Sequence, residues 1–76
     1  MNISTRPPIV RMNRILGDLK AGRAVNCQRL GAELEVSYKT IQRDIDFLRD
    51  RLGIEITYEP SAYSFRIRPG AKVSIL

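Results

Sequence analysis

Only two residues, Glu35 and Val36, separate two amphipathic segments of this sequence. Residues 27–34 (CQRLGAEL) and the segment that begins at Ser37 both carry apolar side chains at helical intervals. A connection this short forces two helices to be neighbours in space, joined by a tight turn. This turn limits the possible folds more than any other feature of the chain.

Each of these two predicted helices has residues suited to its ends. Asn26 and Ser37 have side chains that can cap the first turn of a helix, and Gly53 ends the second helix at about Leu52. Gly31 leaves room for another helix to approach closely. The predicted inward stripes are Cys27, Leu30 and Leu34 in the first helix, and Ile41, Ile45, Leu48 and Leu52 in the second.

Another helix is predicted upstream, from about Pro8 to Ala21. Proline suits the first turn of a helix, and Gly22 can end it by adopting a left-handed conformation. Arg23-Ala24-Val25 then forms a short link. The predicted buried face of this helix consists of Ile9, Met12, Leu16 and Leu19, with Ile15 beside them.

Two runs with a period of two follow the helices and predict a β-hairpin. In residues 54–58 (IEITY) and 63–68 (YSFRIR), the inward residues are predicted to be Ile54, Ile56, Tyr58, Tyr63, Phe65 and Ile67. The turn formers of residues 59–62 (EPSA) connect the runs. The predicted fold is therefore mainly α with a β-hairpin, a winged helix-turn-helix of three helices and a two-stranded wing over residues 8–68. Residues 1–7 are expected to form a flexible arm, and residues 69–76 a tail or the start of a linker.

The helix that begins after Ser37 carries a donor-rich outward face. Its N-terminal half presents Ser37, Lys39, Thr40, Gln42 and Arg43, with Tyr38 nearer the core, while the distal half turns acidic at Asp46 and Asp50. Such donors suit the base edges and phosphates of DNA. The alternative is a solvated face held by ion pairs, such as Arg43 with Asp46.

Composition narrows the classes of function. The 76 residues carry a net charge of +5, which suits a polyanionic partner or serves only solubility. Cys27 is the single cysteine and there is no histidine, so a cysteine–histidine metal site and a histidine-based triad are excluded. No nucleophile–base pair or phosphate-binding glycine loop is present. We therefore expect no enzyme activity, no cofactor and no metal. Because the sequence has neither a membrane-spanning run nor a signal peptide, we expect a cytoplasmic protein.

The stretch from Asn26 to Ile56 closely resembles the winged helix-turn-helix of bacterial DeoR-type transcription regulators, above all the N-terminal domain of WYL-domain regulators. The signature L-x-V-S-x-x-T-I-x-R-D-I-x-x-L is matched by Leu34, Val36, Ser37, Thr40, Ile41, Arg43, Asp44, Ile45 and Leu48. The resemblance implies a homodimeric DNA-binding regulator, most often a repressor, that binds palindromic double-stranded operators. It further implies that the DNA is faced by Ser37, Tyr38, Lys39, Thr40, Gln42 and Arg43.

The same resemblance assigns roles outside this face. Asn26 and Gln28 would touch phosphate, and Asp44 would be structural, bonding a nearby backbone group or arginine. The wing of this family usually has a basic, glycine-containing tip, whereas this turn reads Glu-Pro-Ser-Ala. Arg66 and Arg68 could instead reach phosphates from the strands. The family's ligand-sensing domain normally begins where this chain ends, so we expect either a DNA-binding fragment or a stand-alone protein, with no small-molecule site in these residues.

A second class of function remains open on the residues alone. Winged helices can also bind protein partners, and Phe47, Tyr58, Tyr63 and Phe65 are aromatic side chains that either complete a small core or form an association surface. This alternative is a protein-interaction or dimerisation module without specific DNA reading.

Overall fold

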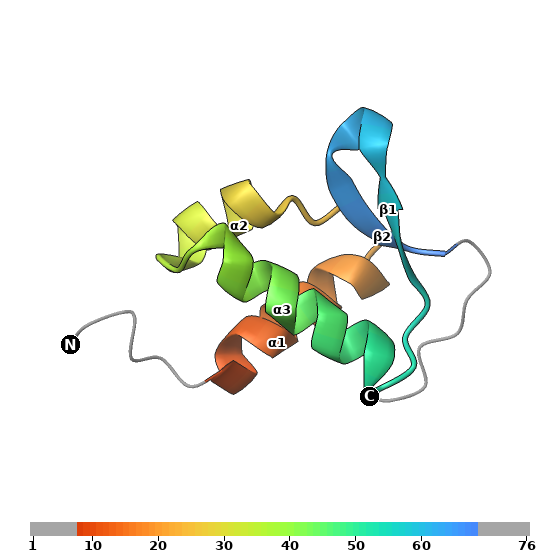
Figure 1. Cartoon of the computed structure of the whole chain (residues 1–76), viewed down its shortest axis with the longest axis horizontal. Helices are drawn as coiled ribbons and strands as arrows, with labels where there is room; N and C mark the ends of the chain where they lie inside the picture. Colours follow the sequence, from red (N-terminus) through yellow and green to blue (C-terminus); the bar gives the residue numbers. More distant parts are fainter. Residues whose placement is uncertain (1–7, 69–76) are drawn as a thin grey trace.

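The computed structural model describes residues 8–68, so the predicted arm (1–7) and tail (69–76) lie outside the described residues. The elements follow in the order α1 (Pro8–Lys20), α2 (Cys27–Leu34), α3 (Tyr38–Asp50), β1 (Ile56–Glu59), the 3₁₀ turn η2 (Pro60–Ala62) and β2 (Ser64–Ile67) (Figure 1). Three helices and a two-stranded antiparallel hairpin confirm the predicted fold class. In Figure 1, α1 lies behind α3, and the hairpin stands beside the start of α2.

The two predicted caps begin α2 and α3 as expected. The Asn26 side chain accepts a hydrogen bond from the backbone N–H of Arg29 at 2.8 Å, and the Ser37 hydroxyl accepts one from Thr40 at 3.2 Å. Each cap satisfies a backbone donor that has no partner within the helix. The start of α3 is therefore fixed by its own first turn.

The turn between α2 and α3 depends on a close backbone approach at Gly31. A Cβ at this position would lie 2.8 Å from the carbonyl oxygen of Val36, and the Val36 N–H donates to the Gly31 carbonyl at 2.9 Å. The predicted reason for this glycine was an approaching helix, but the neighbour is mainly the backbone of the turn itself. Glu35 ends α2 in a left-handed conformation with φ 56°.

The core lies where the C-terminal half of α1 meets α2, α3 and the hairpin. Its buried apolar side chains are Ile15, Leu16, Leu19, Val25, Leu30, Leu34, Ile41, Ile45, Leu48, Ile54, Ile56 and Phe65. The predicted burial of Ile9 and Leu52 is wrong. Ile9 is 62% exposed because it lies in the first turn of α1, away from the buried half, and Leu52 is exposed because α3 has already ended at Asp50.

The strands of the hairpin are shorter than predicted. They pair from Ile56 opposite Ile67 to Glu59 opposite Ser64, so that Tyr58 lies opposite Phe65. The predicted burial of Tyr58 and Tyr63 is wrong, since their exposed fractions are 48% and 73%. Tyr58 lies toward the tip of the hairpin, and Tyr63 lies in the turn with φ 49° instead of in the strand.

The predicted link before α2 contributes a one-residue bridge to the hairpin. Val25 and Phe65 exchange two backbone hydrogen bonds, each 2.8 Å long. Beside this bridge, the Asn26 side-chain amide donates to the carbonyl oxygen of Tyr63 at 2.9 Å. These bonds attach the hairpin to the segment that starts α2, and so fix the hairpin relative to the helices.

Candidate nucleic-acid interface

The N-terminal half of α3 presents an outward face much as the sequence predicts. Ser37, Lys39 and Arg43 are exposed, and Thr40 and Gln42 are half-buried. Tyr38 is 51% exposed and therefore lies further from the core than predicted. The face opposite to it carries Ile41 and Ile45, both fully buried, so the polar side chains are held on a rigid helix.

The charges on α3 separate into a paired half and a half without ion pairs. Arg49 binds Asp46 at 2.9 Å and Asp50 at 3.0 Å, and its hydrogen bond to Asp50 is the main cause of its raised pKa. The alternative pairing of Arg43 with Asp46 or Asp50 is not formed. Within residues 8–68, neither Lys39 nor Arg43 has a carboxylate partner. The N-terminal half of α3 thus keeps its positive charge available to a ligand.

Some of the side chains predicted to contact DNA already have hydrogen-bond partners within the protein. The hydroxyl groups of Ser37 and Thr40 are 3.1 Å apart, and the amide of Gln42 donates to Asp46 at 3.2 Å. Asn26 uses its side-chain oxygen as the cap of α2 and its amide nitrogen to hold Tyr63. Gln28 is exposed on the first turn of α2.

The predicted arginines of the wing are held in ion pairs across the strands. Arg66 binds Glu59 at 2.7 Å and also donates to the carbonyl oxygen of Gly22 at 3.3 Å. Arg68 binds Glu55, and this hydrogen bond lowers the pKa of the Glu55 carboxyl group. The positive charge of each of these two arginines is therefore already matched by a carboxylate within the protein.

Asp44, predicted to be structural, is buried and binds Arg11 of α1, which confirms an arginine partner. The hydrogen bond to Asp44 is the main cause of the raised pKa of Arg11. Both oxygen atoms of the Asp44 carboxylate accept a hydrogen bond from Arg11. Asp44 consequently belongs to the packing between α1 and α3, and not to the outward face.

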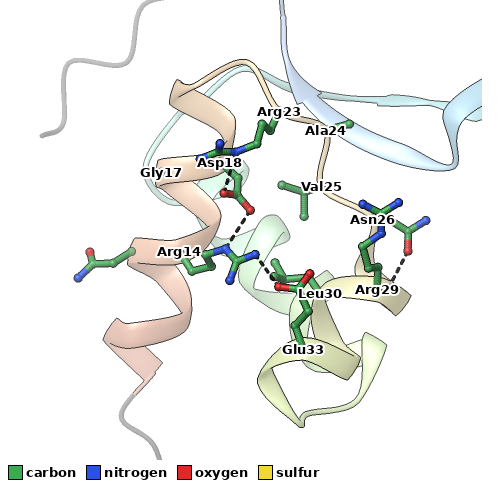
Figure 2. A pocket seen from close by; sticks show the side chains of 11 residues that line it. Arg14, Gly17, Asp18, Arg23, Ala24, Val25, Asn26, Arg29, Leu30 and Glu33 are labelled. Atoms are coloured by element: carbon green, nitrogen blue, oxygen red, sulfur yellow. Dashed lines mark hydrogen bonds and ion pairs between the residues drawn. The ribbon is translucent and has the colours of Figure 1, made fainter.

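A pocket of about 570 Å³ lies between α1, the link and α2 (Figure 2). Figure 2 shows Arg14 reaching from α1 toward Glu33 of α2 and Asp18 of α1, with distances of 2.6 and 3.2 Å. Asp18 also binds Arg23 at 3.3 Å. Because Arg14 and Arg23 are matched by Asp18 and Glu33, this part of the pocket has the character of a polar joint between helices, and Arg29 also lines the pocket. The pocket was not predicted from the sequence, since its ion-pair partners are up to 19 residues apart.

A second groove, of about 440 Å³, lies between the start of α2, α3 and the hairpin. Its lining consists entirely of uncharged side chains: Asn26, Cys27, Gln28, Gln42, Tyr58, Tyr63 and Phe65. Gln42 belongs to both this groove and the outward side of α3. The groove was not predicted, because the alternation of the strands placed both tyrosines on the inward face.

The three helices, the tight turn after α2 and the hairpin define a winged helix-turn-helix. Among protein-family models, one described as an HTH domain matches residues 11–64. The chain belongs to this helix-turn-helix domain family. No curated protein and no solved structure matches it.

Membership of this family supports binding to double-stranded DNA and a role in transcription regulation. Domains of this kind are typically not enzymes. Over residues 8–68, no group of three or more acidic, cysteine or histidine side chains could hold a metal ion. In the same part of the chain, none of the helices has the length and apolar character needed to cross a membrane.

Proposed function

We propose that this protein is a sequence-specific regulator of transcription that reads the major groove of double-stranded DNA with the N-terminal half of α3. The observation that carries this proposal is the pair Lys39 and Arg43, which are exposed and lack carboxylate partners on a helix whose opposite face is fully buried. A rigid helix with exposed cationic donors near its N-terminus is the reading element of helix-turn-helix proteins.

The residues of this face have different roles in the proposal. Arg43 donates to guanine O6 and N7, Lys39 donates to guanine or to phosphate, and the Gln42 amide pairs with adenine after leaving Asp46. Ser37, Tyr38 and Thr40 lie at the start of α3, where hydroxyl groups contact phosphates beside the groove. Asp46 and Asp50 remain bound to Arg49 in the distal half of α3 and do not approach the duplex.

Phosphate contacts flank the reading helix. Gln28 extends from the first turn of α2, and Asn26 contributes by holding that turn in place. Arg66 and Arg68 contact phosphate only by exchanging Glu59 and Glu55 for the DNA backbone. We therefore assign them weaker contributions than those of the two cations on α3.

The finer assignment follows the resemblance to DeoR-type and WYL-domain regulators of bacteria. It describes a cytoplasmic repressor that binds a palindromic operator as a homodimer, with one α3 in each half-site. Two-fold symmetry of the protein then matches that of the operator, and the half-sites lie about one helical turn of DNA apart.

Fluorescence anisotropy tests the proposal. We expect tight binding to a duplex that the protein enriches from a random pool, weaker binding to a scrambled duplex, and a steep loss of affinity between about 50 and 200 mM salt, because phosphate contacts release counterions. Equal binding to both duplexes without salt dependence, or no binding, would refute the proposal.

An association surface is the second candidate, and exposed apolar side chains favour it. Ile9, Val10, Phe47 and Leu52 are all at least two-fifths exposed, although Ile9 and Leu52 were predicted to be buried. Light scattering coupled to size exclusion, at several concentrations and with and without DNA, separates the two functions. A stable oligomer with no affinity for any duplex would favour the interaction module.

A further inference from the structure

We infer that Tyr63 and Tyr58 of the hairpin, with Gln28 of α2, form an uncharged contact site for the DNA backbone immediately beside the reading helix. This inference rests on the proposed function, because the strand it binds belongs to the duplex that α3 reads. It gives the hairpin a way to contact DNA that does not depend on Arg66 or Arg68.

The site is the groove between the start of α2, α3 and the hairpin. Gln42 of α3 lines it on one side, and Tyr58 and Tyr63 line it on the other. Since Gln42 also borders the outward face of α3, a duplex that contacts this face lies next to the groove. The occupant we assign is therefore one sugar–phosphate strand of that duplex.

Tyr63 is placed at this site at an energetic cost. Its backbone is left-handed, with φ 49°, a conformation that favours glycine, and its side chain is 73% exposed. Two hydrogen bonds hold this backbone: the Tyr63 N–H donates to the Pro60 carbonyl at 3.1 Å, and the Asn26 amide donates to the Tyr63 carbonyl at 2.9 Å. A strained and exposed aromatic residue that is held by a buttressing hydrogen bond is typical of a binding site.

Tyr58 packs on a buried aromatic side chain. Its ring packs at a tilt of 59° on the ring of Phe65, with centroids 4.9 Å apart, and Phe65 is buried. This contact leaves nearly half of Tyr58 exposed while limiting its motion. The Tyr58 ring can thus pack on deoxyribose with little loss of side-chain entropy.

The chemistry of the lining fits a DNA backbone although it carries no charge. Tyrosine hydroxyls and glutamine amides are regular donors to phosphate oxygens, and such contacts position a protein on the duplex without reading its sequence. Because no charge is lost or gained, these contacts contribute to affinity but not to its salt dependence.

Substitutions at Tyr63 test the inference with the duplex that the wild-type chain enriches from a random pool. Tyr63→Gly removes the ring and keeps the left-handed backbone, and Tyr63→Phe removes the hydroxyl alone. We expect Tyr63→Gly to weaken binding about tenfold, as for the loss of one well-packed hydrogen-bonded side chain. The slope of log affinity against log salt should stay unchanged, whereas Lys39→Ala should reduce it by about one. Circular dichroism and thermal melting establish that each variant folds.

Cys27 provides a second readout, because the single cysteine of the chain lines the same groove. We expect the enriched duplex to slow the reaction of Cys27 with a thiol reagent in the wild-type protein. In Tyr63→Gly, at DNA concentrations that saturate it, the protection should be smaller. A scrambled duplex at the same concentration serves as the control.

The outcomes separate this inference from the proposed function. If the wild-type chain binds no duplex specifically, the proposed function fails and this inference fails with it. If the wild-type chain binds specifically but Tyr63→Gly binds within about twofold of it, or Cys27 reacts equally with and without DNA, the inference is overturned while the proposed function stands. Weaker binding together with protection of Cys27 supports the inference.

Discussion

Arg11 of α1 and Asp44 of α3 form a two-bonded ion pair across 33 residues of sequence. The distances are 2.7 Å from Nε to Oδ2 and 3.2 Å from Nη2 to Oδ1, and the side chain of Asp44 is only 7% exposed. The planar guanidinium group matches the carboxylate, so the pair fixes both the spacing and the rotation of α3 on α1. The direction in which Lys39 and Arg43 point is thus set partly from beneath the helix.

Removing one partner of this pair should destabilise the fold. We expect Arg11→Met to lower the free energy of unfolding by about 3 kcal/mol, because it leaves a buried carboxylate without its cation. The measurement is urea unfolding followed by circular dichroism. The double variant Arg11→Met/Asp44→Leu is the control, and it should recover much of the loss. If the losses of stability caused by Arg11→Met and by Asp44→Leu alone add up to the loss in the double variant, the pair is not coupled.

Gly31 offers a direct test of the tight turn. Gly31→Ala should lower the free energy of unfolding by about 1–3 kcal/mol, because its Cβ would lie 2.8 Å from the Val36 carbonyl oxygen. Gly17→Ala is a matched control within α1, where a Cβ meets nothing within 4 Å. The control should raise stability by up to about 1 kcal/mol, since alanine favours helices. Equal stability of the two variants would contradict the close approach.

Helix positions were predictable from the sequence because their signals are local. Asn26 and Ser37 cap α2 and α3, and the predicted bounds of α2 are those of the structure. Periodicity overextended the core at Ile9 and Leu52, since a helical pattern does not reveal where the neighbouring elements end. The core takes only the C-terminal half of α1, and in α3 it runs from Ile41 to Leu48.

The candidate site was predictable in part, for a related reason. The face carrying Lys39 and Arg43 follows from helical spacing, but the ion pairs of Arg66 with Glu59 and Arg68 with Glu55 depend on strand register. The left-handed conformation of Tyr63 was also unpredictable, because that position usually holds glycine or asparagine. The hairpin pattern alone placed its ring in the core.

The reactivity of Cys27 should reflect its half-buried position. Burial raises the pKa of its thiol, and the negative charge of Asp46 raises the pKa further. Because the thiolate is the reacting species, the native protein should react with a thiol reagent more slowly at pH 8 than the unfolded chain, by about tenfold for each unit of pKa. The rate of the native protein should also reach half its maximum at a higher pH. Equal pH profiles for native and unfolded protein would contradict a raised pKa.

Removing an arginine from α3 should weaken DNA binding more when that arginine has no ion-pair partner within the protein. On the proposed function, Arg43→Ala should weaken binding to the preferred duplex by about 1–3 kcal/mol and reduce the salt slope by up to about one. Arg49→Ala removes the same charge from the same helix, but Arg49 is already bound to Asp46 and Asp50. It should therefore weaken binding less. Anisotropy titrations measure both, and equal losses would show that net charge alone governs affinity.

Selection of bound duplexes from a random pool tests most directly whether the N-terminal half of α3 reads bases. The wild-type protein should enrich one motif, and Arg43→Ala should enrich the same motif with the preference lost at one position in each half-site. Arg49→Ala should return the wild-type motif unchanged. An identical motif for Arg43→Ala, or no motif for the wild-type protein, would contradict the assignment of α3 as the reading helix.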